Sequence, residues 1–261
     1  MDETGTQPLL ELLGVNKSFG PVHVLHDVDF RVYPGTVTAL VGDNGAGKST
    51  LIKCLAGIYA MDSGRIRFAG RDVAVRGPKD AAALGIEFVY QDLALCDNLD
   101  VVQNMFLGRE SKRSGVLDED AMERLARETL AGLNVRTLKS VRQKVSSLSG
   151  GQRQTVAIAK AVLWNSKLVV LDEPTAALGV AQTAQVLRLV RRLADQGLGV
   201  VIISHNMENV FEVSDRIACL YLGRLAADVE RRNVTRTQVV ELITTGRSGD
   251  LGLARAEAVG I

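Results

Sequence analysis

The sequence predicts an α/β fold built around a parallel β-sheet. Short apolar runs rich in branched residues recur along the chain, for example at residues 168–171 and 199–203. Runs of this length and composition are typical of parallel strands that are buried on both faces. From residue 148 onward such runs alternate with segments of helical spacing. This alternation is expected for a parallel sheet covered by helices.

The amino-terminal part is predicted to contain several strands and one helix. Apolar runs predict strands at residues 9–15, 24–32, 36–41 and 64–68, and the segment 48–56 has helical spacing. A glycine-rich loop separates the third strand from the helix. A strand, a glycine loop and a helix in this order are the context that a phosphate-binding loop needs.

The middle of the chain has a different character. From residue 92 to residue 145 strand signals are few, and three acidic residues at 118–120 precede apolar residues that recur near a 3.6-residue period. Acidic residues suit the amino-terminal end of a helix, where the helix dipole is positive. We therefore expect a helical insertion here. The tail after residue 246 has weak patterning and is expected to be mobile.

Composition narrows the functional classes. The chain has 31 basic and 30 acidic residues and a net charge of +1, which gives no support to a general nucleic-acid binder. No apolar run approaches the roughly 18–20 residues of a membrane span, and the acidic first five residues do not resemble a signal peptide. Cys54, Cys96 and Cys219 share no metal-type spacing and are expected to be small buried hydrophobes in a reducing compartment. We therefore expect a cytosolic chain.

Residues 42–50 read GDNGAGKST, which is a complete phosphate-binding loop. The glycines permit a tight, partly left-handed backbone that turns N–H groups toward phosphate oxygens, and the following helix adds its positive end. The lysine supplies a point charge to the outer phosphates, and the serine hydroxyl suits Mg²⁺. The loop by itself predicts only that the chain binds a nucleoside triphosphate. The residues expected to hold it are Gly42, Asn44, Gly45, Gly47, Lys48, Ser49 and Thr50.

Two acidic residues follow the apolar run at 168–171. They are expected at the carboxyl end of a strand, where open α/β sheets bind ligands. Asp172 then suits Mg²⁺, directly or through water, and Glu173 suits a general base that orients the attacking water. An apolar strand that ends in two acids is commonplace. The pair therefore gains its meaning from the motifs around it.

Residues 148–152 read LSGGQ, and residues 171–175 read LDEPT. The phosphate loop, LSGGQ and LDEP in this order resemble the ATP-binding cassette (ABC) ATPases over nearly the whole chain. The resemblance implies an ATPase with a P-loop NTPase (RecA-like) parallel core, an antiparallel β subdomain and an inserted α-helical subdomain at about 92–147. It implies one cassette over residues 1–246, followed by the tail at 247–261.

The pentapeptide also implies a dimer. Ser149 is placed to cap a helix expected at 152–163, and small residues there let backbone amides approach a phosphate closely. In ABC ATPases this segment contacts ATP held by a neighbouring subunit. The resemblance therefore implies a head-to-tail pair of identical chains with ATP and Mg²⁺ between them. The residues that would bind the neighbour's ATP are Ser149, Gly150, Gly151 and Gln152.

Three single residues take their expected roles from the resemblance alone. Gln91 resembles the glutamine that senses Mg²⁺ and the γ-phosphate, and His205 resembles the switch histidine that holds the attacking water. Phe19 resembles the aromatic residue that stacks on adenine. For Phe19 a role in core packing stays open.

One departure from the family pattern indicates a branch of it. Residues 176–179 read AALG, so Gly179 stands where the family usually has an aspartate that helps to couple the two ATP sites. Cassettes of carbohydrate importers commonly lack this aspartate, and residues 93–110 also resemble that branch. In importers this region receives the coupling helix of the permease.

The resemblance implies a peripheral subunit on the cytoplasmic face of the membrane. It would power import of a small solute, a simple sugar first of all, through a separate permease served by an extracytoplasmic solute-binding protein. Two alternatives stay open: an importer ATPase for another solute, and an ATP switch that acts on the ribosome or DNA. No nucleic acid is expected, because translation-factor and chromosome-type relatives have tandem cassettes or a long coiled coil that this sequence lacks.

Overall fold

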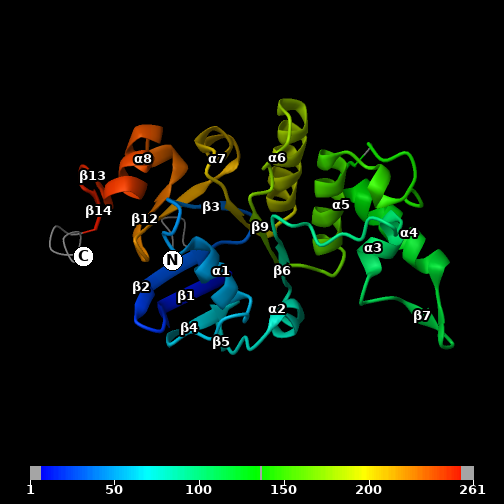
Figure 1. Cartoon of the computed structure of the whole chain (residues 1–261), viewed down its shortest axis with the longest axis horizontal. Helices are drawn as coiled ribbons and strands as arrows, with labels where there is room; N and C mark the ends of the chain where they lie inside the picture. Colours follow the sequence, from blue (N-terminus) through cyan, green and yellow to red (C-terminus); the bar gives the residue numbers. More distant parts are fainter. Residues whose placement is uncertain (1–6, 136, 254–261) are drawn as a thin grey trace.

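A six-stranded sheet forms the centre of the molecule (Figure 1). The computed structural model describes residues 7–135 and 137–253, so the acidic first five residues and the last eight of the expected tail lie outside the described residues. The strand order is β12-β11-β3-β10-β9-β6, and all neighbours are parallel except β12 and β11. The strands are β3 (Val37–Gly42), β6 (Ile86–Val89), β9 (Leu168–Asp172), β10 (Gly199–Ile203), β11 (Arg216–Tyr221) and β12 (Arg224–Glu230).

A separate antiparallel sheet with the order β2-β1-β4-β5 lies beside α1 (Lys48–Leu55). The strands predicted at residues 9–15, 24–32 and 64–68 are β1, β2 and β4 of this sheet, and the one predicted at 36–41 is β3 of the central sheet. β1 continues to Phe19, and the three-residue β5 was not predicted. Register shifts along the β1–β2 pair allow β1 to continue past the apolar run into polar residues. The strands are β1 (Leu10–Phe19), β2 (Val22–Val32), β4 (Ser63–Phe68) and β5 (Arg71–Val73).

Helices cover both faces of the central sheet. In Figure 1, α6, α7 and α8 lie on one face, and α1 with the antiparallel sheet lies on the other. Successive side chains of a strand point to opposite faces of the central sheet. In β3, Ala39 and Val41 belong to the core under the helices, whereas Leu40 belongs to the core shared with the antiparallel sheet. The helices are α1 (Lys48–Leu55), α2 (Pro78–Leu84), α6 (Val180–Asp195), α7 (Met207–Val213) and α8 (Arg236–Thr245).

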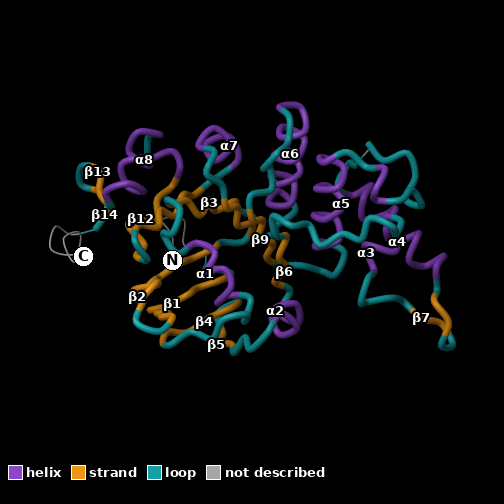
Figure 2. The backbone as a smooth tube through the Cα atoms, viewed as in Figure 1, coloured by secondary structure: helices purple, strands orange, loops and turns teal. Residues whose placement is uncertain are grey.

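The segment between β6 and β9 is mainly helical (Figure 2). The helix predicted from the acidic start is α4, and the Asp118 carboxylate accepts a hydrogen bond from Ala121 N at 3.0 Å. A small exposed hairpin, β7–β8, was not predicted, because two residues per strand are too few to give a periodic signal. The elements are α3 (Val101–Phe106), β7 (Lys112–Arg113), β8 (Val116–Leu117), α4 (Glu119–Gly132), a 3₁₀ turn (Val145–Ser147) and α5 (Gly150–Val162).

The chain after β12 forms a 3₁₀ turn (Arg231–Asn233), α8 and a short hairpin. The hairpin consists of β13 (Arg247–Ser248) and β14 (Leu251–Gly252), so the described part of the expected tail has regular structure.

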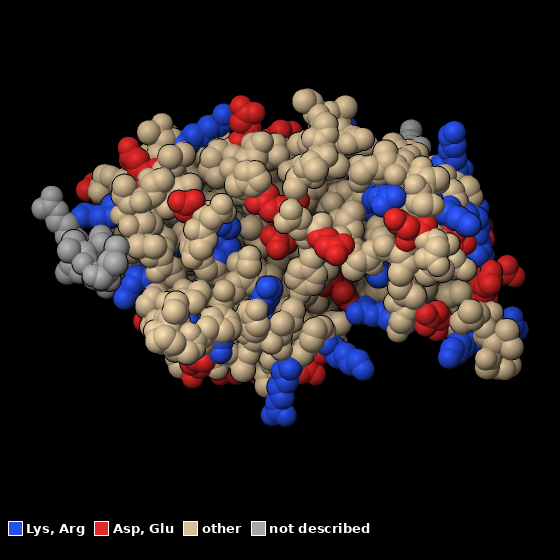
Figure 3. Space-filling model, viewed as in Figure 1, with Lys and Arg blue, Asp and Glu red and all other residues tan. Residues whose placement is uncertain are grey.

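Three expectations from composition can be checked on the described residues. Cys54 and Cys219 are buried as expected, and Cys96 is half-buried. Among the described helices, none combines the length and apolar character that crossing a bilayer requires. On the face shown in Figure 3, acidic and basic side chains are interspersed. This distribution accords with the near-zero net charge.

Candidate functional site

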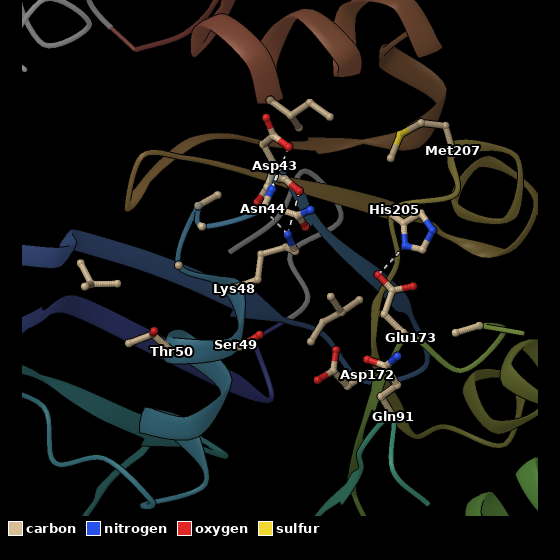
Figure 4. A pocket seen from close by; sticks show the side chains of 18 residues that line it. Asp43, Asn44, Lys48, Ser49, Thr50, Gln91, Asp172, Glu173, His205 and Met207 are labelled. Atoms are coloured by element: carbon tan, nitrogen blue, oxygen red, sulfur yellow. Dashed lines mark hydrogen bonds and ion pairs between the residues drawn. The ribbon is translucent and has the colours of Figure 1, made fainter.

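A cleft of about 780 Å³ lies at the carboxyl ends of β3, β9 and β10 (Figure 4). Ligands of open α/β sheets bind at this edge, because the loops that follow parallel strands meet there. Side chains from both faces of the sheet contribute to the wall. The lining residues are Val24, Gly42, Asp43, Asn44, Gly45, Ala46, Gly47, Lys48, Ser49, Thr50, Gln91, Asp172, Glu173, Ala176, Ile203, His205, Met207 and Ile243.

The glycines of the phosphate loop are required by close packing as well as by backbone angles. A Cβ at Gly42 would lie 2.4 Å from the carbonyl oxygen of Leu220. Gly47 has φ of +103°, and a Cβ there would lie 2.8 Å from the Leu25 side chain. The loop is therefore held tightly between β2 and the end of β11.

Lys48 is the first residue of α1, and its side chain extends back into the loop. Its Nζ donates hydrogen bonds to the carbonyl oxygens of Gly42 at 2.7 Å and Asp43 at 3.0 Å. Burial lowers the pKa of the Lys48 ammonium, while the negative charges of Glu173, Asp43 and Asp172 raise it. The loop thus positions a partly desolvated cation beside a glycine-rich turn at the amino end of α1, an arrangement that suits a phosphate chain.

The two acids at the end of β9, Asp172 in its last position and Glu173 directly after it, face the same cleft. Burial and the neighbouring Glu173 charge raise the pKa of the Asp172 carboxyl, and the Lys48 charge lowers it. Glu173 has a left-handed backbone, with φ of +48°, and its N–H donates to Ile203 O at 3.0 Å. A non-glycine residue in this conformation, directly before a proline, is strained, and such strain clusters at functional sites. In this conformation Glu173 lines the cleft.

His205 pairs with Glu173. Its Nδ1 lies 2.9 Å from Glu173 Oε1, as the dashed line in Figure 4 marks. The His205 side chain is 77% exposed, whereas that of Glu173 is 17% exposed. The end of β10 therefore presents an imidazole to solvent while it holds the carboxylate. Gln91, two residues past β6, lines the same cleft.

The oxygen donors in the cleft fit Mg²⁺. They comprise the Ser49 hydroxyl, the Gln91 amide and the Asp172 carboxylate. Mg²⁺ is usually bound by one or two carboxylates together with substrate phosphates and water. The described residues contain no cluster of three or more His, Cys, Asp or Glu side chains that would form an all-protein metal cage. The pKa of Asp172 is raised first by burial and then by the Glu173 charge, and a bound cation would favour the carboxylate form.

The LSGGQ segment lies elsewhere. Ser149 caps α5: its hydroxyl accepts from Gln152 N at 3.4 Å, and Gln152 Oε1 accepts from Ser149 N at 2.9 Å. Ser149 and Gly150 are exposed, whereas Gly151 is buried against Gln182 of α6, where a Cβ would approach to 3.0 Å. Among the described residues that line the cleft, none comes from this segment. The structure does not bring the two motifs together within one chain.

Phe19 is also outside the cleft lining. Its ring is 42% exposed and packs edge-on against Tyr59, with the ring centroids 5.0 Å apart. Lys17 Nζ lies 5.3 Å from the Phe19 ring centroid. The side chain thus has a packing partner, and part of its surface faces solvent.

Sequence reasoning missed several wall residues. Val24 lines the cleft because the β1–β2 register shifts between Lys17 and Ser18, which leaves Val24 out of the pairing and re-aims it. Met207 and Ile243 reach the cleft from α7 and α8. Neither residue carries a motif. Their contribution depends on how the helices pack, and no signal in the sequence reports that.

Gly179, the departure from the family pattern, is the N-cap residue of α6. Its N–H donates to Gln182 Oε1 at 3.4 Å, so the helix begins with half of a capping box. Glycine supplies no side-chain oxygen to complete it.

A phosphate loop, an acidic strand end and a histidine in one cleft define a nucleoside-triphosphate-binding α/β protein. The chain belongs to the ABC transporter family, whose model matches residues 25–176. The expected family, fold class and ATPase activity are therefore confirmed.

Individual proteins show the same relationship. The chain is 44% identical to the fructose import ATP-binding protein FrcA of Rhizobium meliloti, over 91% of this chain and 94% of that protein. It is 42% identical to the xylose/arabinose import ATP-binding protein XylG of Sulfolobus acidocaldarius, over 94% of this chain and 97% of that protein. The crystal structure of a nucleotide-free ATP-binding cassette from an ABC transporter matches with a TM-score of 0.79 at 28% identity, covering 90% of this chain and 98% of that one.

Proposed function

We propose that the chain is the ATP-hydrolysing subunit of an importer for a small solute and that the solute is a simple sugar. The observation that carries the proposal is the identity of more than 40% with two sugar import ATP-binding proteins, over nearly the full length of each. The absence of a carboxylate at Gly179 supports the same branch. The subunit would lie on the cytoplasmic face of the membrane and drive a separate permease, which an extracytoplasmic binding protein would supply with solute.

The cleft residues have separate tasks in this proposal. The backbone of the phosphate loop and the Lys48 ammonium bind the phosphates of ATP, and Thr50 lies beside them in the first turn of α1. Ser49, Gln91 and Asp172 would hold Mg²⁺, which would neutralise phosphate charge. Asn44 faces the same cleft. Phe19 stacks on adenine at the outer edge of the site.

Hydrolysis requires a positioned water. Glu173 orients the water and accepts its proton as the oxygen attacks the γ-phosphorus, and ADP leaves with the broken bond's electron pair. His205 contacts the γ-phosphate and the water. In the described chain these two side chains bond each other at 2.9 Å, so an arriving γ-phosphate would compete for the imidazole.

Two chains are needed to complete a site in this proposal. The exposed Ser149 and Gly150 lie at the amino end of α5, with Gly151 and Gln152 behind them in its first turn. The amino end of a helix attracts anions, but this end of α5 does not line the cleft of its own chain. A head-to-tail pair would place each α5 start over the ATP of the other chain. The helical subdomain at about 92–147, which belongs to the single cassette at 1–246, would contact the permease.

Comparison of the wild type with Glu173→Gln tests the enzymatic part. We expect Mg-ATP turnover to fall about a hundredfold or more, since a general base contributes that much. Nucleotide binding should remain, and ATP-dependent dimers should accumulate in the variant. Equal turnover by the two proteins would refute the role of Glu173.

The cargo requires a cellular test. Deletion of the gene, followed by uptake assays across a sugar panel, should abolish import of one sugar or a small group. Loss of uptake of a non-sugar solute instead would favour the first alternative. Co-purification with ribosomes or DNA rather than a polytopic permease would favour the second.

A further inference from the structure

The phosphate loop is held from outside by the turn between β11 and β12. Gly223 N donates to Ala46 O of the loop at 3.0 Å, and Gly223 O accepts from His26 N of β2 at 2.9 Å. A Cβ at Gly223 would lie 2.2 Å from Val24 O. The turn is therefore packed without spare room between β2 and the loop, and a shift of the turn must move one of them.

The residue before this turn contacts the end of α8. Gly246 is the C-cap residue of α8, with φ of +75°, and a Cβ there would lie 2.7 Å from Cδ1 of Tyr221. Tyr221 is the last residue of β11, and Leu222 and Gly223 follow it at once. The contact therefore continues from α8 through Tyr221 to the phosphate loop.

The β13–β14 hairpin fixes Gly246 in place. Leu253 N donates to Gly246 O at 2.9 Å, and a Cβ at Gly252 would lie 2.2 Å from the same oxygen. The hydroxyl of Ser248, which is 5% exposed, donates to the Glu241 carboxylate one turn back on α8. The hairpin thus closes on the helix end with one hydrogen bond from β13 and one from the residue directly after β14.

Helix α8 also reaches the cleft directly. Its buried residues are Val239 and Leu242, whereas Ile243 is half-buried and lines the nucleotide cleft. At its other end, Arg236 stacks over the ring of Phe211 in α7, 5.7 Å from the centroid. The helix is therefore anchored at both ends, and Ile243 projects into the cleft between them.

We propose that the carboxyl-terminal segment, α8 with the β13–β14 hairpin, positions the nucleotide site. Its end packs against Tyr221 and thereby fixes the position of the phosphate loop. It also supplies Ile243 as an apolar residue of the cleft wall. Gly246 is the positioning residue, since it acts on the loop through Tyr221, and Ile243 is a wall residue. The inference concerns nucleotide binding by a single chain and does not depend on which solute is transported.

Two glycines with similar backbones provide a matched test. Gly246 and Gly249 have φ of +75° and +55°, so alanine is strained at both, but a Cβ at Gly249 meets no described atom within 4 Å. We expect Gly246→Ala to raise the Kd of a fluorescent ATP analogue in EDTA about three- to tenfold, the usual effect of one disturbed packing contact. Gly249→Ala should leave Kd unchanged. Both are measured well below their melting transitions.

A second pair keeps the inference testable if Gly246→Ala does not fold. Ile243→Ala should raise the same Kd about threefold, as loss of a partly buried branched side chain does. Ile243→Val should restore most of the affinity, and Val240→Ala, at an exposed position of the same helix, should match the wild type. In turnover assays KM should rise and kcat should not. Unchanged Kd in Ile243→Ala, or equal effects of the two glycine variants, would overturn the inference; failure of the wild type to bind ATP would overturn the proposed function instead.

Discussion

The phosphate loop and the LSGGQ segment are both starts of helices that suit an anion, but they are built differently. Packing holds the base of the loop: a Cβ at Gly42, at Gly47 or at Gly223 of the β11–β12 turn would meet neighbouring atoms, whereas the side of the loop that faces the cleft is open at Gly45. Ser149 and Gly150, by contrast, are exposed, and only Gly151 is packed against its own chain. Lys48 supplies a charge in the first region, and the segment 148–152 contains no charged residue.

This difference indicates which ligand each region serves. A loop that must hold phosphates in one chain needs a preformed shape and a fixed cation. A segment that meets its ligand only when a second chain arrives must stay accessible and needs only a capped helix end. In the proposed head-to-tail pair the two regions would be complementary halves of one site.

The largest expected effect comes from a charge placed at the accessible half. Ser149→Asp keeps a good helix cap, so α5 should remain intact. A carboxylate facing the neighbour's γ-phosphate would cost several kcal/mol, so turnover should fall about a thousandfold. The Kd of ATP for the single chain should not change, and equilibrium binding measures it. A tenfold weaker Kd would mean that the segment belongs to its own chain's site.

A smaller effect is expected from the packed half. Lys48→Ala should raise the Kd of ATP about ten- to a hundredfold, since hydrogen bonds to a charged group contribute roughly 1.5–3 kcal/mol. Lys53→Ala, on the same helix but outside the cleft lining, is the control. Mixing the Lys48→Ala and Ser149→Asp chains should restore part of the turnover, because such a pair contains one complete site. No recovery at any ratio would contradict the complementary halves.

The smallest effect concerns stability. The pKa of Asp172 is raised in the folded, nucleotide-free chain, so ionisation of this carboxyl lowers the free energy of unfolding. This destabilisation is fully present above the folded-state pKa and disappears below the ordinary value of 3.8. Asp172→Asn should therefore raise the melting temperature at pH 7 by about 1–2 °C. Thermal melts from pH 7 to pH 4 should show this gain shrinking as pH falls. A variant less stable at pH 7 would show that the charge is already compensated.

The fold was predictable wherever a pattern is local. The run before the phosphate loop became β3, and Asp118 and Ser149 cap the helices that their positions indicated. The β7–β8 hairpin and the extension of β1 were not predictable. The hairpin is too short to give a period, and the extension depends on register shifts that only the paired strand determines.

The cleft residues also fall into a group that the sequence predicts and a group that it does not. Lys48, Asp172, Glu173 and His205 belong to motifs and meet in one cleft as expected. Wall residues that depend on packing carry no motif, as Ile243 illustrates. Phe19 is the opposite case: its position in the sequence matches the aromatic residue expected to stack on adenine, but in the structure its ring packs against Tyr59.

The glycine at position 179 has one more consequence. Its φ of −71° is open to any residue, and a side chain there would meet no described atom within 4 Å. An aspartate would even provide α6 with the side-chain cap that it lacks. The architecture therefore tolerates the acid that the family usually has. Packing therefore does not account for the glycine, and Gly179→Asp is expected to leave the scaffold unaltered, so that its effect on communication between the two proposed ATP sites can be measured separately from folding.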